Sequence, residues 1–454
     1  MIALAGLAVV NIPFLTQMGL AAAGTVVVSV VIALTLLPAL LGFIGPRVLG
    51  GRIPGLRSHD PEQDEGHTLG SRWGVFVAGH PVPVLLVGVL ALLTIAVPAL
   101  DIRLGLPDDG MAAADTTQRK AYDLLSAGFG PGFNGPLTVV VDTTGAKVLD
   151  PATKVASAVA ALPDVVAVTP PIVNPAGNTA ILSVIPKSGP NDPATGDLVS
   201  GIRDSAAVRQ AQAGAAVAVT GPTAINIDIS GRIAQSLLPY LALVVGLAIL
   251  LLMLVFRSIL VPVKAALGFL LSVAAAFGAV VAVFQWGWLS GLLGVAATGP
   301  IVSLMPIFLI GVVFGLAMDY EVFLVTRMRE EFVHGTEPTQ AVITGFRHGV
   351  RVVTAAAIIM ISVFAGFLSS HETLIKAMGF ALAAAVALDA FVVRMTIVPA
   401  VMTLLGRSAW WLPGWLDRLL PSVDVESESL RRELDSPEPE PDTTPQSDLT
   451  GSRS

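Results

Sequence analysis

The chain of 454 residues contains no cysteine, and only 13% of its residues are charged. The lack of cysteine excludes disulfide bonds and thiolate metal sites. The charged share is about half of the roughly 25% that is usual for a soluble domain. Together with 54% hydrophobic residues and a mean hydropathy of +0.78, this low charge indicates a polytopic membrane protein.

Motifs for common kinds of catalysis and nucleotide binding are also missing. The six histidines show no HExxH spacing, and neither a GxxxxGK[ST] phosphate loop nor a GxSxG nucleophile elbow occurs. We therefore expect no cofactor, no metal site, no enzymatic activity and no energy supply from ATP bound by this chain. The net charge of −7 owes much to an acidic tail, and we expect no nucleic-acid partner.

Apolar runs predict where the chain crosses the bilayer, since a spanning helix needs about 20 mostly apolar residues. Eight runs qualify as candidates, at residues 1–15, 18–44, 82–100, 239–256, 261–284, 301–325, 352–368 and 375–405. With eight spans, the arginines and lysines of the connections fall on one face, which the positive-inside rule assigns to the cytoplasm. We count Lys264 among these connection charges. The pattern predicts a multi-pass protein of the inner, or plasma, membrane.

Residues 101–235 form a less apolar stretch that this topology places outside the cytoplasm. Its patterning predicts helices at 114–127, 151–162 and 192–206 and strands at 136–142, 165–169, 179–186 and 215–220. The order of elements is that of a split βαβ unit, a four-stranded sheet with two helices on one face. The predicted fold is therefore a polytopic α-helical membrane protein of about eight transmembrane helices with one extracytoplasmic α+β ferredoxin-like, porter-type domain.

The first and last spans resemble each other, which indicates an internal repeat. MIALAGLAVVNIPFLTQMG at the start aligns with MISVFAGFLSSHETLIKAMG from Met360, and TLLPALLGFIG from Thr35 aligns with TIVPAVMTLLG from Thr396. Such repeats are typical of transporters built from two related halves. We expect the chain to lack four spans and one outward domain of a first unit, through a false start site, a split gene with a partner chain or a decayed gene. The alternative is a shorter protein that never had these parts. The expected protein partner is a missing N-terminal half or, in a homo-oligomer, another copy of the chain.

The resulting division of the chain has six parts. They are residues 1–45, the last two spans of the first unit; 46–81, a cytoplasmic linker; 82–100, a span; 101–235, the extracytoplasmic domain; 236–406, five spans; and 407–454, a cytoplasmic aromatic anchor with a disordered acidic tail.

Asp319 lies inside the apolar run 300–329 and is the first candidate site residue. An ionised carboxylate costs at least about 2.5 to 3.5 kcal/mol at the centre of a spanning helix, so it needs a partner, a proton or water. Tyr320 follows it and points about 100° away around the helix. We interpret the pair as a proton or ion relay, with a buried helix-packing hydrogen bond as the alternative. Glu321 is expected to snorkel to the cytoplasmic surface.

Asp389 and Arg394 are the other intramembrane charges of interest. Counted from the outward end, Arg394 lies at about the depth of Asp319, and a bridge between them would hold that carboxylate ionised. Alternatively, Asp389 and Arg394 satisfy each other, although a separation of five residues is awkward on a straight α-helix. A role in the relay and a structural ion pair both remain open.

Three stretches carry a family resemblance. GLAMDYEVFLVTRMREEFVHG, GFRHGVRVVTAAAIIMISVFAGF and DAFVVRMTIVPAVMTLLG resemble the mycobacterial membrane protein large (MMPL) family of the resistance-nodulation-division superfamily. The resemblance covers the chain from its start to about residue 420. It implies a proton-driven exporter of lipids or other hydrophobic molecules. Its partners would be this hydrophobic substrate, membrane lipids and protons. Asp319 and Tyr320 match the family's Asp-Tyr pair in the second unit, whereas the pair of the first unit falls in the missing part.

Two other functions remain as alternatives to export. One is a protein-translocation motor of the Sec accessory type, which has a related helix bundle. The other is a non-transporting envelope scaffold or truncated remnant.

Overall fold

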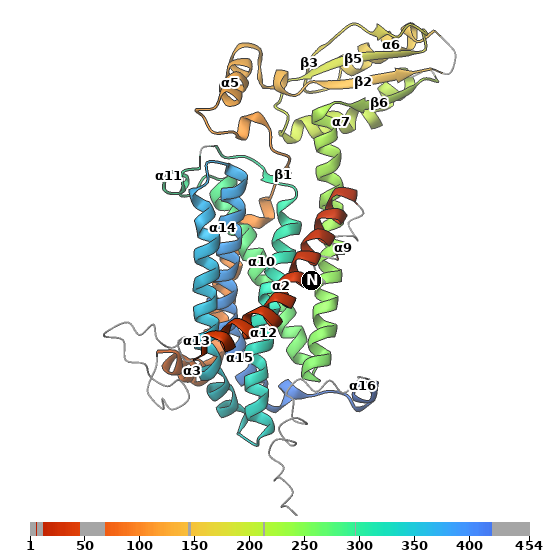
Figure 1. Cartoon of the computed structure of the whole chain (residues 1–454). Coiled ribbons are helices and arrows are strands. Elements are labelled where there is room, and N and C mark those ends of the chain that lie inside the picture. Colours follow the sequence, from red (N-terminus) through yellow and green to blue (C-terminus); the bar gives the residue numbers. More distant parts are fainter. Residues whose placement is uncertain are drawn as a thin grey trace, which may run out of the picture.

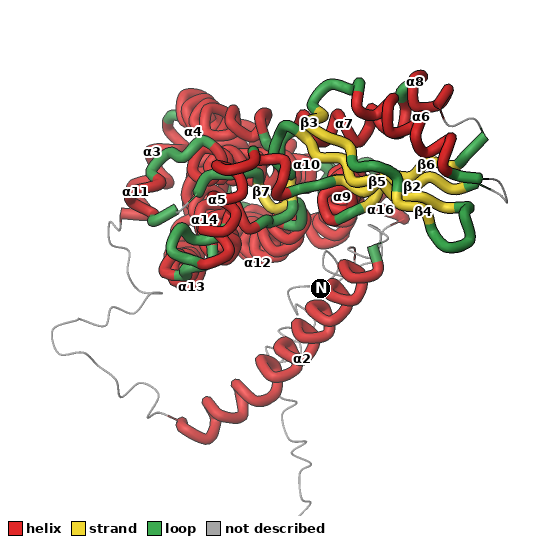
Figure 2. Tube along the Cα trace, turned by 90° about the horizontal axis from the view of Figure 1, so that it is seen from above, coloured by secondary structure: helices red, strands yellow, loops and turns green. Residues whose placement is uncertain are grey.

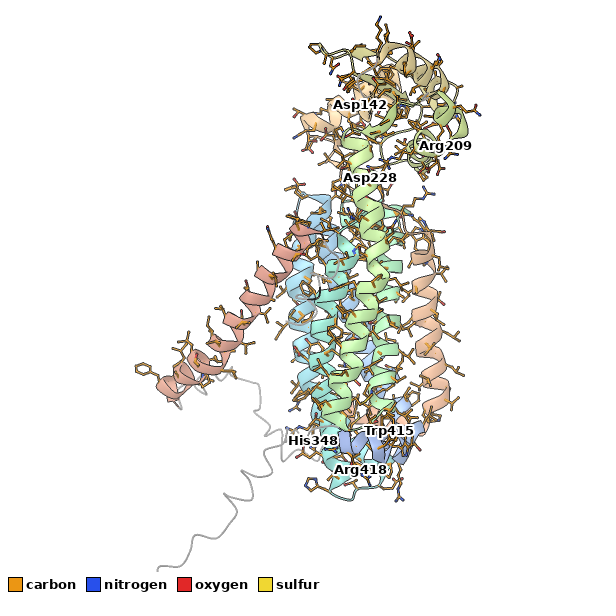
Figure 3. The ribbon with its side chains drawn as sticks, turned by 90° about the vertical axis from the view of Figure 1, so that its right-hand side faces the viewer. Asp142, Arg209, Asp228, His348, Trp415 and Arg418 are labelled. Atoms are coloured by element: carbon orange, nitrogen blue, oxygen red, sulfur yellow. The ribbon has the colours of Figure 1, made fainter. Side chains whose placement is uncertain are left out.

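The computed structural model describes residues 6, 12–45, 69–143, 147–211, 214–295 and 297–419. The long helices form a bundle with an α+β domain at one end (Figure 1), apart from the helix Pro13–Ile44, which stands away from the others at an angle (Figures 2 and 3). Asp142 and Arg209 lie in that domain, whereas His348, Trp415 and Arg418 lie at the opposite end of the bundle (Figure 3). The acidic tail, most of the apolar run 1–15 and residues 46–68 of the predicted linker are outside the described residues.

Within the described residues, seven helices are long and apolar enough to cross a membrane. They are α2 (Pro13–Ile44), α4 with its extension (Pro81–Asp101), α9 (Pro222–Phe256), α10 with its extension (Leu260–Gln285), α12 (Met305–Val333), α13 with its extension (Pro338–Ser369) and the long element Thr373–Trp410. The last comprises α14 (Thr373–Ala387), a π-helical segment (Leu388–Ile397) and α15 (Val398–Leu405). Each of the seven matches a predicted span.

The α+β domain has the strand order of a split βαβ unit. Its elements are β2 (Leu137–Asp142), α6 (Leu149–Ala160), β3 (Val165–Val168), β4 (Ile172–Val173), β5 (Thr179–Pro186), α7 (Pro193–Asp204), α8 (Ala206–Ala211) and β6 (Ala216–Thr220). The sheet order is β3-β5-β2-β6, all antiparallel, and the short β4 also pairs with β5. The helices α6, α7 and α8 lie on one side of the sheet (Figure 2).

Alternation along the strands places the core of this domain under those helices. Leu137, Val139 and Val141 of β2 and Ala180, Leu182 and Val184 of β5 are buried, and they pack in one cluster with apolar residues of α6 and α7. Successive strand residues point to opposite faces, so this pattern buries one face of the sheet and leaves the other uncovered. The Asp192 side chain caps α7 by accepting a hydrogen bond from the backbone of Ala194, at 3.0 Å.

Both connections of the domain are tied to the start of α12. The two-residue strand β1 (Leu104–Gly105) pairs in parallel with β7 (Ile301–Val302), directly before α12. On the other connection, α9 continues unbroken from the domain into the bundle, and Ser303 Oγ donates to Ser230 Oγ of α9 at 2.8 Å. The segment that leads into α12 therefore contacts both connections between the α+β domain and the bundle.

The last part of the predicted linker contains a helix that the sequence analysis did not indicate. Residues Leu69–Gly79 form α3, and the indole of Trp73 donates to the carbonyl of Met395 at 2.9 Å. Glycines on α3 make a close approach to α13 possible: a Cβ at Gly74 would lie 2.9 Å from the ring of Phe346. The helix therefore packs on the bundle rather than running free between spans.

The aromatic residues after the last span divide into two kinds. Trp410 stacks on Phe332 of α12 with ring centroids 5.9 Å apart, so it belongs to the packed bundle. Trp411 and Trp415 are exposed, the latter within the short helix α16 (Gly414–Leu419), and remain candidates for contact with the membrane interface.

Candidate functional site

Four charged side chains meet inside the bundle, with Glu321 of α12 between two cations. Its Oε2 lies 2.8 Å from Nη1 of Arg394, and its Oε1 lies 2.8 Å from Nζ of Lys264 in α10. Only 1% of the Glu321 side chain is exposed. The expectation that Glu321 reaches the cytoplasmic surface is therefore wrong, and so is the assignment of Lys264 to the connections, because Lys264 is 9% exposed and held inside the bundle.

Asp389 completes this charge cluster through Arg394. Nε of Arg394 donates to Oδ2 of Asp389 at 2.6 Å, while Nη1 of the same guanidinium binds Glu321. Both residues lie in the π-helical segment, whose hydrogen bonds run from residue i to i+5. The wider turn brings positions five apart onto one face, which removes the difficulty of this spacing on a straight α-helix. Such π-helical insertions are frequent at functional sites.

The charge cluster of Lys264, Glu321, Asp389 and Arg394 is balanced, because two acids face two bases. Burying four charges is costly, and mutual attraction offsets that cost only if the geometry is good and the polar atoms are bonded. Here the bonding is incomplete: Nζ of Lys264 and Oδ1 of Asp389 are buried without a hydrogen-bond partner in the described structure. The ammonium of Lys264 is thus close to Glu321 but poorly aligned with it. A free buried carboxylate oxygen is a place where a proton can be held.

Asp319 and Glu321 point to nearly opposite sides of α12, since two residues correspond to a rotation of about 200°. Glu321 faces the charge cluster, whereas Asp319 is exposed on the outer side of the helix and Tyr320 is partly buried between them. The expected bridge between Asp319 and Arg394 is not formed, because the guanidinium is occupied by Glu321 and Asp389. Arg394 nevertheless acts electrostatically on both Asp319 and Tyr320.

No group of three or more histidine or acidic residues suited to hold a metal ion occurs in the described part of the chain. The charge cluster places two carboxylates beside two cations. Carboxylates lie on both sides of one helix turn, and a guanidinium lies within electrostatic reach of both.

Comparison with known proteins identifies the family. The model of the MMPL family matches residues 1–84 and 111–424. The membrane protein YdfJ of Bacillus subtilis is 46% identical over 436 residues, which are 95% of this chain and 59% of that protein.

Two MmpL11 proteins are also similar. The "Mycolic acid-containing lipids exporter MmpL11" of Mycolicibacterium smegmatis is 34% identical over 429 residues, covering 93% of this chain and 44% of that protein. The "Heme uptake protein MmpL11" of Mycobacterium tuberculosis strain H37Rv is 35% identical over 430 residues, with the same coverage of 93% and 44%. The chain thus spans about half the length of the relatives it matches.

The printed names of these two MmpL11 proteins describe transport. The family match covers most of the bundle and the α+β domain, including Asp319, Tyr320 and all four residues of the charge cluster. With seven apolar helices long enough to cross a membrane, the chain is a multi-pass membrane protein, and it belongs to the MMPL family.

Proposed function

We propose that the chain forms part of a transporter that uses the proton-motive force to export lipids or other hydrophobic molecules. The observation that carries this proposal is that two carboxylates on one turn of α12 have different environments. Asp319 is exposed within a membrane-crossing helix, and Glu321 is fixed two residues later in the buried charge cluster. A carboxylate in such a position is favourable only when it is protonated or partnered, so its charge state depends on its surroundings.

Protonation of Asp319 would change the balance of forces on Arg394. When Asp319 is ionised, it attracts the guanidinium in competition with Glu321 and Asp389; when it is neutral, that competition ends. Tyr320 stands between the two sides and is acted on by Asp319, Asp389 and Arg394, which suits it to pass a proton or a hydrogen bond between them. The relay proposed here therefore consists of Asp319 and Tyr320, with Arg394 and Asp389 as the part that responds.

Movement of α12 would be transmitted to the α+β domain through the two segments that connect this domain to the bundle. The β1–β7 pairing and the Ser303–Ser230 hydrogen bond link both segments to the start of α12. A membrane potential supplies about 2.3 kcal/mol per charge per 100 mV, and in this mechanism one or two protons per cycle drive the rearrangement of the helices. In this mechanism the spans rock against each other and the extracytoplasmic domain guides a lipid away from the outer leaflet.

Relatives support a hydrophobic cargo, since one MmpL11 is described as an exporter of mycolic acid-containing lipids. The test is deletion of the gene in its own host, with lipids extracted separately from the cell interior and the envelope. We expect a lipid to accumulate inside the cells of the deletion strain. Expression of the wild-type gene should remove this accumulation, whereas expression of Asp319→Asn should not. Glu331→Gln, near the end of the same helix, is the matched control and should act as wild type.

Other outcomes of the same experiment decide against export. Full relief by Asp319→Asn would contradict the relay. Loss of secreted proteins instead of lipid accumulation would favour a Sec-type motor. Loss of haem acquisition without lipid accumulation would favour uptake, the activity for which the other MmpL11 is named.

A further inference from the structure

The outward end of the bundle contains a cavity of about 140 Å³, next to the segment that leads into the α+β domain. We call it the outward cavity. Its walls come from the loop after β1, the end of α10, β7 with the start of α12, and the start of α14. In Figure 1, β1 and the short helix α11 (Ser290–Leu293) mark this end of the bundle. Met305 of the cavity and Glu321 of the charge cluster are sixteen residues apart on α12, or roughly 24 Å, so the two sites are separate.

Most of the wall of the outward cavity is apolar and adaptable. The residues that line it include Met111, Phe284, Ile301, Met305 and Leu374. Methionine side chains are unbranched and flexible, so they adjust to the shape of a ligand. An engineered apolar cavity of about 150 Å³ in another protein holds benzene. The volume therefore suits one ring or one short alkyl chain rather than the two acyl chains of a bilayer lipid.

The charged residues that line the outward cavity, among those the structure describes, are Asp108 and Glu372, and both are acidic. Neither takes part in a salt bridge within this part of the chain. Glu372 directly precedes α14, but its side chain makes no capping hydrogen bond there. The lysine of α14, Lys376, is engaged elsewhere, since its Nζ donates to the carbonyl of Gly294 at 2.6 Å. In the described structure the cavity therefore carries two carboxyl groups and no cation.

The surroundings of Asp108 show the same lack of a counter-charge. Burial raises the pKa of this carboxyl above its ordinary value, and the charge of Asp109 raises it further. The groups that oppose this shift are backbone N–H groups, those of Gly110 and Met111 among them, rather than a side-chain cation. A positive charge beside the carboxyl would favour its ionised form. Because no described side chain supplies that charge, a ligand is suited to provide it.

We propose that the outward cavity binds a free hydrophobic ammonium ion. The ammonium lies beside Asp108 and Glu372, and the ring or alkyl chain fills the space among the apolar side chains. Phe284 adds to the attraction, because the face of an aromatic ring attracts a cation. A neutral molecule would leave the two carboxylates without a counter-charge, and an anion would be repelled by them. The proposal depends neither on export nor on proton coupling, which we assign to Asp319 and the charge cluster.

Single cysteines measure the charge preference of the outward cavity, because the natural chain has no cysteine. Ala112→Cys places a thiol on the cavity wall, and Gly128→Cys, at an exposed position of the helix α5 (Thr117–Phe129), is the matched control. The full chain in lipid nanodiscs is treated with 2-aminoethyl methanethiosulfonate, a cation, and with 2-sulfonatoethyl methanethiosulfonate, an anion. We expect the ratio of the cation's rate to the anion's rate to be at least about tenfold higher at Ala112→Cys than at Gly128→Cys.

Substitution of the acids distinguishes the cavity from the general charge of the surface. Asp108→Asn combined with Glu372→Gln should bring the ratio at Ala112→Cys to within about twofold of the control. Asp109→Asn removes an adjacent exposed carboxylate that does not line the cavity, and should lower the ratio by less than about threefold. Equal ratios at Ala112→Cys and Gly128→Cys would overturn the proposal, and so would a ratio that the double substitution leaves unchanged.

Protection from labelling tests binding of the ligand itself. Hexylammonium, hexanol and hexanoate share one alkyl chain and differ in charge, and methyl methanethiosulfonate is an uncharged thiol reagent. Hexylammonium in excess over its dissociation constant should slow the reaction of this reagent with Ala112→Cys at least about fivefold. Hexanol and hexanoate at the same concentration should slow it less than about twofold. The double substitution of Asp108 and Glu372 should remove the protection by hexylammonium.

Two results of the protection experiment would contradict the proposal. Equal protection by hexanol and hexylammonium would show an apolar cavity without preference for a cation. Protection by none of the three compounds would show that the cavity binds no such ligand. Ala297→Cys, on another part of the cavity wall, gives the same readout and takes the place of Ala112→Cys if that variant does not fold.

Discussion

Glu321 and Arg394 form a buried ion pair, with 2.8 Å between Oε2 and Nη1, although 73 residues separate them in the chain. The pair joins α12 to the π-helical segment of the last span. It also places Arg394 where the charge state of Asp319, on the far side of α12, can influence it.

Glu321→Gln is expected to destabilise the bundle strongly. The substitution leaves Lys264 and one arm of Arg394 buried without a counter-charge, and breaking a buried ion pair from one side costs about 3 to 5 kcal/mol. Unfolding of the detergent-solubilised protein measures the change in free energy. Asp319→Asn is the matched control, an exposed carboxylate two residues away, and should alter stability by less than about 0.5 kcal/mol. Equal stability of the two variants would show that the charge cluster does not hold the helices together.

Arg394→Lys should abolish transport while the protein still reaches the membrane. The guanidinium uses Nε for Asp389 and Nη1 for Glu321, and an ammonium has no planar fork with which to hold both carboxylates in this geometry. Substrate export by cells that produce equal amounts of each protein is the measurement. Arg407→Lys, an exposed arginine after α15, serves as control. Wild-type export by Arg394→Lys would mean that positive charge alone is sufficient at this position.

Gly278→Ala should separate α10 from the end of α4. A Cβ at Gly278 would lie 1.9 Å from the carbonyl oxygen of Ile95, a distance at which backbone must move. We expect a loss of stability of at least about 1 to 3 kcal/mol, the usual range for overpacking. Gly246→Ala, where a Cβ meets nothing within 4 Å, should be neutral or stabilise the helix by up to about 1 kcal/mol. The measurement is the midpoint temperature of thermal unfolding of the two variants. Similar midpoints would contradict the close approach of α10 and α4.

Asp108, in the loop that leads into the α+β domain, makes stability depend on pH. Burial raises the pKa of this carboxyl above its ordinary value, and the neighbouring charge of Asp109 adds to the effect. Between the unfolded pKa of about 3.9 and the raised folded value, the folded state binds more protons than the unfolded state, so stability falls as pH rises through this window.

Asp108→Asn removes this titration. The variant should be more stable than wild type at pH 7, and the difference should vanish below about pH 3.9, where both side chains are neutral. Unfolding of the purified protein across this pH range provides the measurement. A variant that is less stable at pH 7 would show that hydrogen bonds from the backbone of Gly110 and Met111 to the carboxylate outweigh its burial.

Much of the architecture could be predicted because it follows from local patterns. Hydropathy located the seven described spans, and alternation in β2 and β5 with the caps of the helices indicated the split βαβ order. The buried charges were harder to interpret. Lys264 lies near the start of α10, and Glu321 lies just past the middle of α12. In the sequence, a long charged side chain that snorkels looks the same as one that faces inward.

The π-helical segment and α3 were missed for a different reason. Hydrogen bonding from i to i+5 depends on tertiary packing, and no residue type in Leu388–Ile397 signals it. The helix α3 is short and flanked by charged sequence, and its contacts with α13 and Met395 become visible only in the folded chain. The position of Asp319 within an apolar run could be predicted from sequence, but the direction in which it points could not.

The most direct test of the account is proton movement into sealed proteoliposomes. The proteoliposomes would enclose a pH-sensitive dye in their lumen. A proton gradient and a lipid extract of the host would be supplied together. Wild type should acidify the lumen in a lipid-dependent manner, and Asp319→Asn should show no more acidification than empty vesicles, although it folds normally. Lipid-dependent proton entry at the wild-type rate in Asp319→Asn would contradict the central claim that this carboxylate couples protons to transport.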